Sequence, residues 1–199
     1  MRRLLVATGN RGKVVELHEL LGHERFEVVS LTDVGVESPE ETGTTFRENA
    51  VLKARLAARA SGLPTVADDS GIVVDALGGE PGVRSARFAG DDATDADNRA
   101  LLLERLRGTE PDRRAARFVC VIAVAEPDGT TETFEGFLEG RVAEQERGSG
   151  GFGYDSIFLL DDGRTVAELA PEEKNRMSHR ARALEKALPY IHSLFDEDA

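Results

Sequence analysis

Two adjacent carboxylates and a lysine-bearing turn are the residues of this chain best suited to phosphate chemistry. Asp68 and Asp69 follow an apolar run in the segment ADDSG, and neighbouring carboxylates of this kind can coordinate magnesium or activate water. The segment TGNRGK at 8–13 lies between a strand-like run and a helical pattern, so its backbone amides and Lys13 can bind an anion. These two segments together predict a site for a phosphorylated ligand and a divalent cation.

Further charged and aromatic residues have both an ordinary and a functional interpretation. Glu41 precedes a helix start and Lys53 lies within that helix, where the ordinary roles are helix-dipole compensation and a solvated charge. Phe152 and Tyr154 flank a glycine in the segment GGFGYD, and their rings either stack on a base or pack in the core. Asp155 ends that segment and could orient hydrogen bonds to a base or a sugar.

The C-terminal motif EEKNRMSHR places a histidine and an arginine after a helix-capping residue. Ser178 suits a helix N-cap, so His179 and Arg180 are either first-turn residues of the last helix or ligand contacts. The remaining histidines have no zinc-ligand spacing and are interpreted as structural or exposed; they are His18, His23 and His192.

Composition excludes several classes of protein. The 199 residues suit one domain or two joined lobes, and the formal net charge of −12 opposes binding to nucleic acid. A single cysteine, Cys120 in the apolar run FVCVIAVA, excludes an intrachain disulfide and is interpreted as a buried spectator. No apolar run approaches the roughly 20 residues that span a bilayer, so we expect a cytoplasmic protein.

Hydrophobic periodicity predicts an α/β fold in which strands alternate with helices. Strands are expected at 3–7, 26–31, 65–67, 72–76, 117–125 and 130–142, with a short strand ending at residue 160. Helices are expected after residue 13, at 45–61, at 95–106 and at the C-terminus. Strands 117–125 and 130–142 flank Pro-Asp-Gly and are predicted to pair as a hairpin. The acidic segment ADDSG is predicted to be a turn between two short strands.

The phosphate-binding segment is not the common P-loop, because Ala7 and Val14 occupy the positions where that motif needs a glycine and a serine or threonine. Instead, a series of motifs resembles the inosine triphosphate pyrophosphatase family over nearly the whole chain. They are ATGNRGK, EETGTTFRENA, KAR, ADDSG, LGGEPGVRSARFAG, GGFGYD and AELAPEEKNRMSHR, in the family's order.

The resemblance implies a fold and an activity. The fold would be an elongated mixed β-sheet flanked by helices, with two lobes and a central active-site cleft, in a single domain over residues 1–199. The activity would be hydrolysis of deaminated purine nucleoside triphosphates (ITP, dITP, XTP) to the monophosphate and pyrophosphate. The resemblance also implies a homodimer that binds a purine nucleoside triphosphate, and composition leads us to expect no nucleic-acid or membrane partner.

The resemblance further assigns roles to residues of the motifs. Asp69 and Lys53 would be catalytic, and Glu41 and Asp69 would bind Mg²⁺. Substrate contacts would come from residues in the first, fourth, sixth and seventh motifs: Thr8, Gly9, Asn10, Arg11, Gly12, Lys13, Ser70, Phe152, Gly153, Tyr154, Asp155, Lys174, His179 and Arg180.

Two positions depart from the family pattern, and three other functions stay open. Ser156 replaces the usual proline after GYD, which predicts slightly altered base selectivity, and Ile72 conservatively replaces leucine.

A Maf-like pyrophosphatase for modified pyrimidine triphosphates would use similar chemistry. A nucleotide sensor would bind without turnover, and a nucleic-acid-binding module is opposed by the acidic charge.

Overall fold

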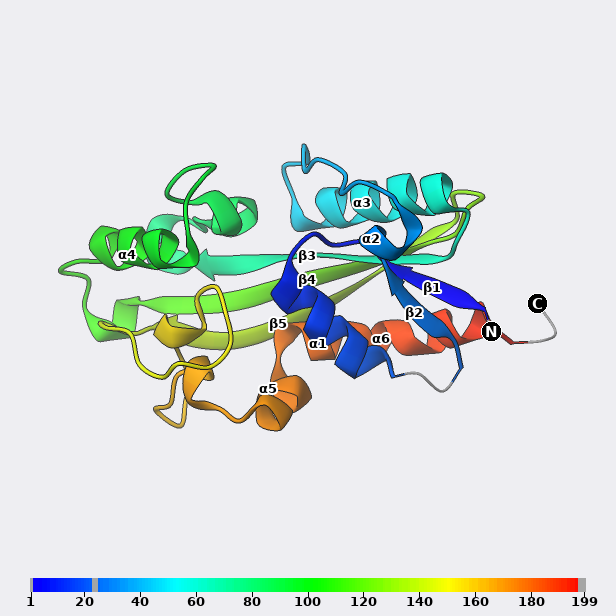
Figure 1. Cartoon of the computed structure of the whole chain (residues 1–199). Coiled ribbons are helices and arrows are strands. Elements are labelled where there is room, and N and C mark those ends of the chain that lie inside the picture. Colours follow the sequence, from blue (N-terminus) through cyan, green and yellow to red (C-terminus); the bar gives the residue numbers. More distant parts are fainter. Residues whose placement is uncertain (1, 23–24, 197–199) are drawn as a thin grey trace. The chain divides into compact units, whose positions relative to one another are not determined.

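The computed structural model describes residues 2–22 and 25–196 and has an α/β fold (Figure 1). The strands are β1 Arg3–Val6, β2 Glu27–Ser30, β3 Thr65–Val74, β4 Ala115–Ala125, β5 Thr131–Val142 and β6 Phe158–Leu159. The α-helices are α1 Arg11–Leu21, α2 Leu31–Val34, α3 Phe46–Ser61, α4 Asp95–Arg105, α5 Pro171–Met177 and α6 His179–Ser193. Short 3₁₀ helices are η1 Asp75–Leu77, η2 Gly82–Arg87, η3 Pro111–Arg113, η4 Asp155–Ile157 and η5 Val166–Glu168.

The six strands form one mixed sheet in the order β2-β1-β3-β4-β5-β6. Strand β1 pairs in parallel with β2 and β3, whereas β5 and β6 are antiparallel. The expected hairpin is confirmed, because β4 and β5 are neighbours joined by a turn in which the Glu126 amide donates to the Thr130 carbonyl over 2.9 Å. The expected α/β fold with a mixed sheet is therefore confirmed.

Two boundaries expected from the sequence are wrong. Residues 65–74 form one continuous strand, β3, and not two strands separated by an acidic turn. Leu31 begins the short helix α2 rather than ending a strand, because Ser30 and Asp33 form a capping box that starts a helix there. The expectation for His23 lies outside the described residues.

The chain divides into two compact units, which agrees with the expected two lobes. Unit 1 contains Met1–Asp69, Cys120–Gly136 and Arg180–Ala199, and unit 2 contains Ser70–Val119 and Phe137–His179. Strands β3, β4 and β5 each contribute residues to both units.

The sheet of unit 1 is covered by helices on both faces, as its strand pattern requires. In β1, Leu4 points to one face and Leu5 to the other, because side chains alternate along a strand. Leu4 belongs to a core cluster with Leu17 of α1 and Leu184 of α6. Leu5 belongs to a second cluster that contains the alanine stripe of α3, which is Ala50, Ala54, Ala57 and Ala58. Because alanine side chains are small, α3 can pack close to β3, and Figure 1 shows the helix alongside this strand.

Unit 2 has its own apolar core. It includes Ile72 and Val74 of β3, Leu102 of α4 and Phe158 of β6, all fully buried. The ring of Phe118 stacks on that of Phe158 with the centroids 4.2 Å apart. Each unit thus buries enough apolar surface to hold polar side chains in fixed positions.

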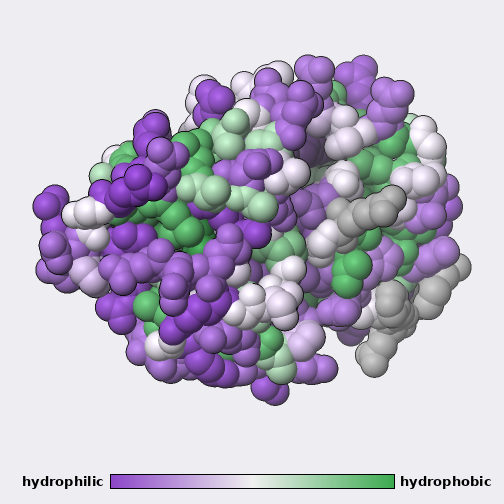
Figure 2. Space-filling model, turned by 60° about the vertical axis from the view of Figure 1, so that its left-hand side comes forward, coloured by the Kyte–Doolittle hydropathy of each residue, from purple (hydrophilic) through white to green (hydrophobic). Residues whose placement is uncertain are grey.

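The surface is mainly polar. Figure 2 shows one face, where hydrophilic residues predominate and apolar residues form smaller patches. Among the described residues, the large apolar side chains that are exposed are Val15, Leu56 and Phe137. No helix in the described part of the chain combines the length and hydropathy needed to cross a membrane.

Candidate active site

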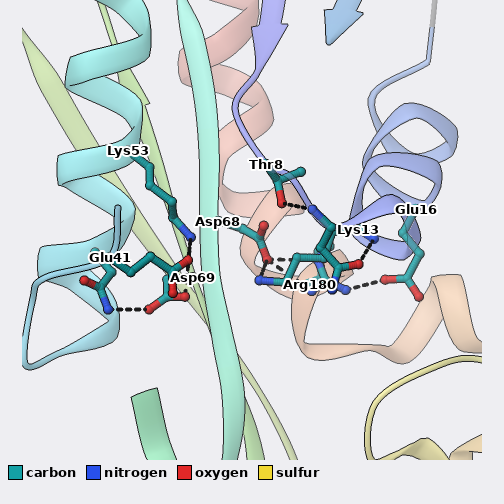
Figure 3. A network of polar contacts seen from close by, with 10 residues as sticks. Thr8, Lys13, Glu16, Glu41, Lys53, Asp68, Asp69 and Arg180 are labelled. Atoms are coloured by element: carbon teal, nitrogen blue, oxygen red, sulfur yellow. Dashed lines mark hydrogen bonds and ion pairs between the residues drawn. The ribbon is translucent and has the colours of Figure 1, made fainter. Parts of the chain in front are cut away.

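The two aspartates of ADDSG point to opposite sides of β3. Since residues 65–74 are a single strand, adjacent side chains must alternate between the faces of the sheet. Figure 3 shows Asp68 on one side of the strand and Asp69 on the other. Both side chains are buried, with 0% and 4% of the residue surface exposed. The pair therefore does not form one two-carboxylate site, as a turn would have allowed, and each aspartate belongs to a separate cluster in unit 1.

Asp69 belongs to a cluster with a lysine and a glutamate, which we call the acid–lysine cluster (Glu41, Lys53 and Asp69). The Lys53 ammonium donates to Glu41 Oε1 over 2.5 Å and to Asp69 Oδ1 over 3.5 Å (Figure 3). Lys53 is 3% exposed, so the solvated-charge interpretation is wrong. The N-terminus of α3 is capped by Thr45 and Glu48, which form a capping box, while Glu41 pairs with Lys53.

The acid–lysine cluster changes the proton affinities of its members. Burial raises the pKa of Asp69 above its ordinary value, and the nearby Glu41 carboxylate adds to this, although Lys53 acts in the opposite direction. Burial alone would lower the pKa of Lys53, but the surrounding carboxylates outweigh it and raise that pKa. A carboxylate with raised proton affinity beside a protonated lysine is suited to accept a proton from water.

Asp68 belongs to the second cluster, the clamp cluster (Lys13, Glu16, Asp68 and Arg180). Its Oδ2 atom accepts from Lys13 Nζ over 3.1 Å and from Arg180 Nη2 over 3.1 Å. Arg180, which is 1% exposed, also forms an ion pair with Glu16 of α1. Burial would raise the pKa of Asp68, but Lys13 and Arg180 hold that pKa far below its ordinary value. Asp68 is therefore ionised at every physiological pH and is a poor base.

The segment at 8–13 forms the expected link between a strand and a helix. Asn10 is the N-cap of α1, and its side chain accepts from the Lys13 amide over 3.2 Å. Thr8 Oγ1 accepts from the Asn10 amide over 3.2 Å, which fixes the turn. Arg11 and Gly12 are the first two residues of α1, and first-turn amides have no acceptor within their own helix. The helix N-terminus thus offers partial positive charge next to Lys13.

Unit 2 contains a second group of expected site residues. The Lys174 ammonium donates to Asp155 Oδ2 over 2.7 Å and lies 4.7 Å from the centroid of the Phe152 ring. Asp155 Oδ2 also accepts from the Phe152 amide over 3.0 Å. Gly151 has φ +72°, a left-handed conformation that glycine adopts without strain. Lys174 and Asp155 therefore fix the position of the Phe152 ring, which is only partly buried.

The other expected residues of unit 2 have packing roles as well. The Tyr154 ring lies in the core of unit 2, and its hydroxyl donates to the Ser85 carbonyl over 2.7 Å. The core interpretation therefore accounts for Tyr154. His179 is 8% exposed, and its ring stacks on Phe118 with the centroids 4.8 Å apart. The Gly153 amide donates to Asp95 Oδ2 over 2.8 Å. Ser70 lies in β3, directly after Asp69.

Three residues that contact the expected site had no site role in the sequence interpretation. Asn49 donates to Asp69, Glu16 pairs with Arg180, and Phe118 stacks on His179. Asn49 is four residues before Lys53 and so lies on the same face of α3, which is a signal that could have identified it. Glu16 and Phe118 approach their partners only through the tertiary fold, and no local pattern indicates either contact.

The interpretation of Cys120 as a buried residue agrees with the structure. Cys120 is fully buried, and burial raises the pKa of its thiol to about 12. Across residues 2–22 and 25–196, no three histidines, cysteines or acidic residues are grouped as a metal site.

The fold and the two clusters define a class of protein. It is an α/β protein in which lysines lie beside buried carboxylates, an arrangement suited to binding a small anionic ligand. The model of the Ham1 family matches residues 4–190. The dITP/XTP pyrophosphatase of Symbiobacterium thermophilum is 54% identical over 196 residues, which cover 98% of both chains. That of Escherichia coli O157:H7 is 49% identical over 191 residues, which cover 94% of this chain and 97% of the relative.

Solved structures agree with the family match. The structure of a HAM1 protein from Coxiella burnetii has a TM-score of 0.88 and 43% identity, and the match covers 97% of this chain and 100% of that one. The chain belongs to the Ham1 family. The resemblance to nucleoside triphosphate pyrophosphatases that the sequence motifs indicated is confirmed.

Proposed function

We propose that the protein hydrolyses deaminated purine nucleoside triphosphates (dITP, ITP and XTP) to the monophosphate and pyrophosphate. Its relatives at 49% and 54% identity are dITP/XTP pyrophosphatases, which supports this substrate class. The observation that carries the reaction type is the acid–lysine cluster, in which a buried carboxylate of raised pKa lies 3.5 Å from a buried ammonium.

We also propose that Glu41 and Asp69 bind Mg²⁺. The donor set fits this ion, because Mg²⁺ is usually held by one or two carboxylates and completes its coordination with water and substrate phosphates. The Glu41 carboxylate also contributes to the raised pKa of Asp69, and a divalent cation between the two carboxylates would relieve their repulsion. When bound, the ion would neutralise charge on the phosphate oxygens.

In the proposed reaction, water attacks the α-phosphorus and gives up a proton to Asp69. The new bond from oxygen to phosphorus forms while the bond to the bridging oxygen breaks, and pyrophosphate leaves. Lys53 would stabilise negative charge on the oxygens that surround the phosphorus. The N-terminus of α1, with Thr8, Gly9, Asn10, Arg11, Gly12 and Lys13, would hold the triphosphate.

Base recognition is assigned to residues of unit 2, with Ser70 and Gly153 as further substrate contacts. Phe152 would stack on the purine, since Tyr154 is occupied in the core. Lys174 and His179 would donate hydrogen bonds to the 6-keto oxygen, which adenine replaces with an amino group. Arg180 was expected to contact the substrate, and its ion pairs with Asp68 and Glu16 support a role in holding Asp68 instead.

A product assay with Mg²⁺ tests this function. Purified protein is incubated with ITP, XTP, GTP, ATP and a modified pyrimidine triphosphate, and monophosphate and pyrophosphate are quantified. We expect ITP and XTP to be cleaved much faster than ATP. Preference for the modified pyrimidine would indicate the Maf-like alternative. Saturable binding of ITP with no pyrophosphate release would indicate a nucleotide sensor.

We further propose that the protein is a cytoplasmic homodimer of single 1–199 domains that acts on free nucleotides. The net charge of −12 supports action on free nucleotides, because it opposes binding to nucleic acid and to anionic membranes. Light scattering coupled to size-exclusion chromatography measures the mass in solution. A mass near 21.6 kDa would identify a monomer.

A further inference from the structure

The side chain of Asn49 connects the two carboxylate-bearing segments of the acid–lysine cluster. Asn49 lies in the first part of α3 and is 0% exposed. Its amide nitrogen donates to Asp69 Oδ2 over 3.1 Å, and its amide oxygen accepts from the Gly43 amide over 2.7 Å. One buried amide thus holds Asp69 and the backbone two residues after Glu41.

The hydrogen-bond partners fix how the Asn49 amide is oriented. A backbone amide can only donate and a carboxylate can only accept, so exchanging the nitrogen and oxygen would create two repulsive contacts. No other side chain of this size both donates and accepts at a fixed angle. Aspartate would place a carboxylate against Asp69, and leucine would leave the buried Gly43 amide and Asp69 oxygen without this partner.

The segment that carries Glu41 is also fitted closely to Asn49. A Cβ atom added to Gly43 would lie 2.7 Å from Asn49 Oδ1 and 2.7 Å from Glu48 Cβ. Glu48, the neighbour of Asn49, accepts from the Thr44 amide over 2.7 Å. The backbone after Glu41 is therefore held by two side chains from the first turn of α3, and only Asn49 also reaches Asp69.

We propose that Asn49 is a positioning residue for the reaction: it holds Asp69 and the Glu41 segment in the relative arrangement that catalysis requires. The expected loss of kcat rests on the proposed function, whereas the bridge between Asp69 and Gly43 does not depend on it. Asn49 does not contact the reacting atoms. Its loss would misplace the carboxylate that accepts the proton, and a displacement of about 1 Å can cost about 10²-fold in rate.

The chain offers a matched control in Asn98. This residue is 1% exposed, and its amide donates to the Ala86 carbonyl over 3.1 Å and accepts from the Ala89 amide over 2.8 Å. Both asparagines thus link a helix to backbone outside it, but in the described part of the chain the Asn98 amide is bonded to two backbone groups rather than to a carboxylate. Replacing either residue removes a similar buried network.

The test compares Asn49→Asp, Asn49→Ala and Asn98→Ala by ITP kinetics at about pH 9, because a high pH favours the ionised form of the introduced carboxyl group. Asn49→Asp keeps the acceptor for Gly43 and replaces the donor to Asp69 with a negative oxygen. We expect it to lose about 10²-fold in kcat with little change in KM. Asn98→Ala should keep the wild-type kcat at temperatures where it is folded. Wild-type kcat in Asn49→Asp would overturn the proposal.

Hydrogen exchange of residues 40–46 provides a readout that needs no activity. The Gly43 amide should exchange as slowly in Asn49→Asp as in the wild type, and faster in Asn49→Ala. Unchanged slow exchange in Asn49→Ala would overturn the bridging role, even if the wild type hydrolysed none of the triphosphates. If Asn49→Ala does not fold, Gly43→Ala displaces the same contact, and wild-type kcat in that variant would overturn the proposal as well.

Discussion

Replacing Arg180 with methionine should strongly destabilise unit 1. Arg180 is 1% exposed and pairs with Asp68, which is fully buried, and with Glu16, whose side chain is 11% exposed. Removing the arginine leaves the clamp cluster with two carboxylates and one cation, Lys13, and removing one partner of a buried ion pair costs about 3–5 kcal/mol. Methionine keeps the helix propensity and much of the apolar volume of α6, so the loss reports on charge.

The expected loss is measurable by calorimetry or by thermal unfolding followed with circular dichroism. For a chain of 199 residues, about 2–4 °C of Tm corresponds to 1 kcal/mol. Arg180→Met should therefore lower Tm by about 6–20 °C. Arg164→Met is the control, because Arg164 pairs with Glu173 at the surface, where the side chains are 44% and 35% exposed. This control should unfold close to the wild-type temperature.

A second substitution separates the ion pair from other effects of losing the arginine. In Arg180→Met, the Glu16 carboxylate is left without its guanidinium. Adding Glu16→Gln should recover part of the lost stability, with a coupling of about 1 kcal/mol or more. The reasoning fails if Arg180→Met unfolds like the wild type, or if the double variant is destabilised by the full sum of the two single changes.

Three other substitutions or reactions test separate parts of the structure. Asp69→Asn should lower kcat for ITP by about 10²–10⁴-fold while ITP still binds, and near-normal turnover would remove Asp69 as the base. Tyr154→Phe should cost about 1–3 kcal/mol of stability because the buried Ser85 carbonyl loses its donor, while the ITP to ATP rate ratio stays constant; a changed ratio would return Tyr154 to base recognition. Cys120, whose thiol pKa is about 12, should react with Ellman's reagent at neutral pH only after unfolding in guanidinium, so rapid native labelling would contradict its burial.

Elements with local signals could be predicted from the sequence. Helix α3 begins after Thr45, which forms a capping box with Glu48, and ends at Gly62 in the left-handed conformation. The turn between β4 and β5 was marked by Pro-Asp-Gly. In both cases the residues that determine the structure are neighbours in the sequence, so a pattern over a few residues contains the necessary information.

Strand β3 could not be predicted correctly, because tertiary contacts override its local composition. Aspartate disfavours strands and glycine suits turns, so ADDSG has the composition of a turn. In the fold, Lys53 compensates the buried charge of Asp69, and Lys13 and Arg180 compensate that of Asp68. These cations come from α3, α1 and α6, and no pattern within residues 65–74 indicates that they are present.

The continuity of β3 determines the chemistry that the two aspartates can perform. In a turn, both carboxylates could face one ligand and share a proton. In a strand they separate, so one face holds Asp68 ionised between two cations, while the other face raises the pKa of Asp69. Environments that separate the proton affinities of two carboxylates assign them different roles. The strand thus suits Asp69 to the proposed role of proton acceptor, whereas Asp68 is a fixed charge that holds Lys13, at the start of α1, and Arg180 in place.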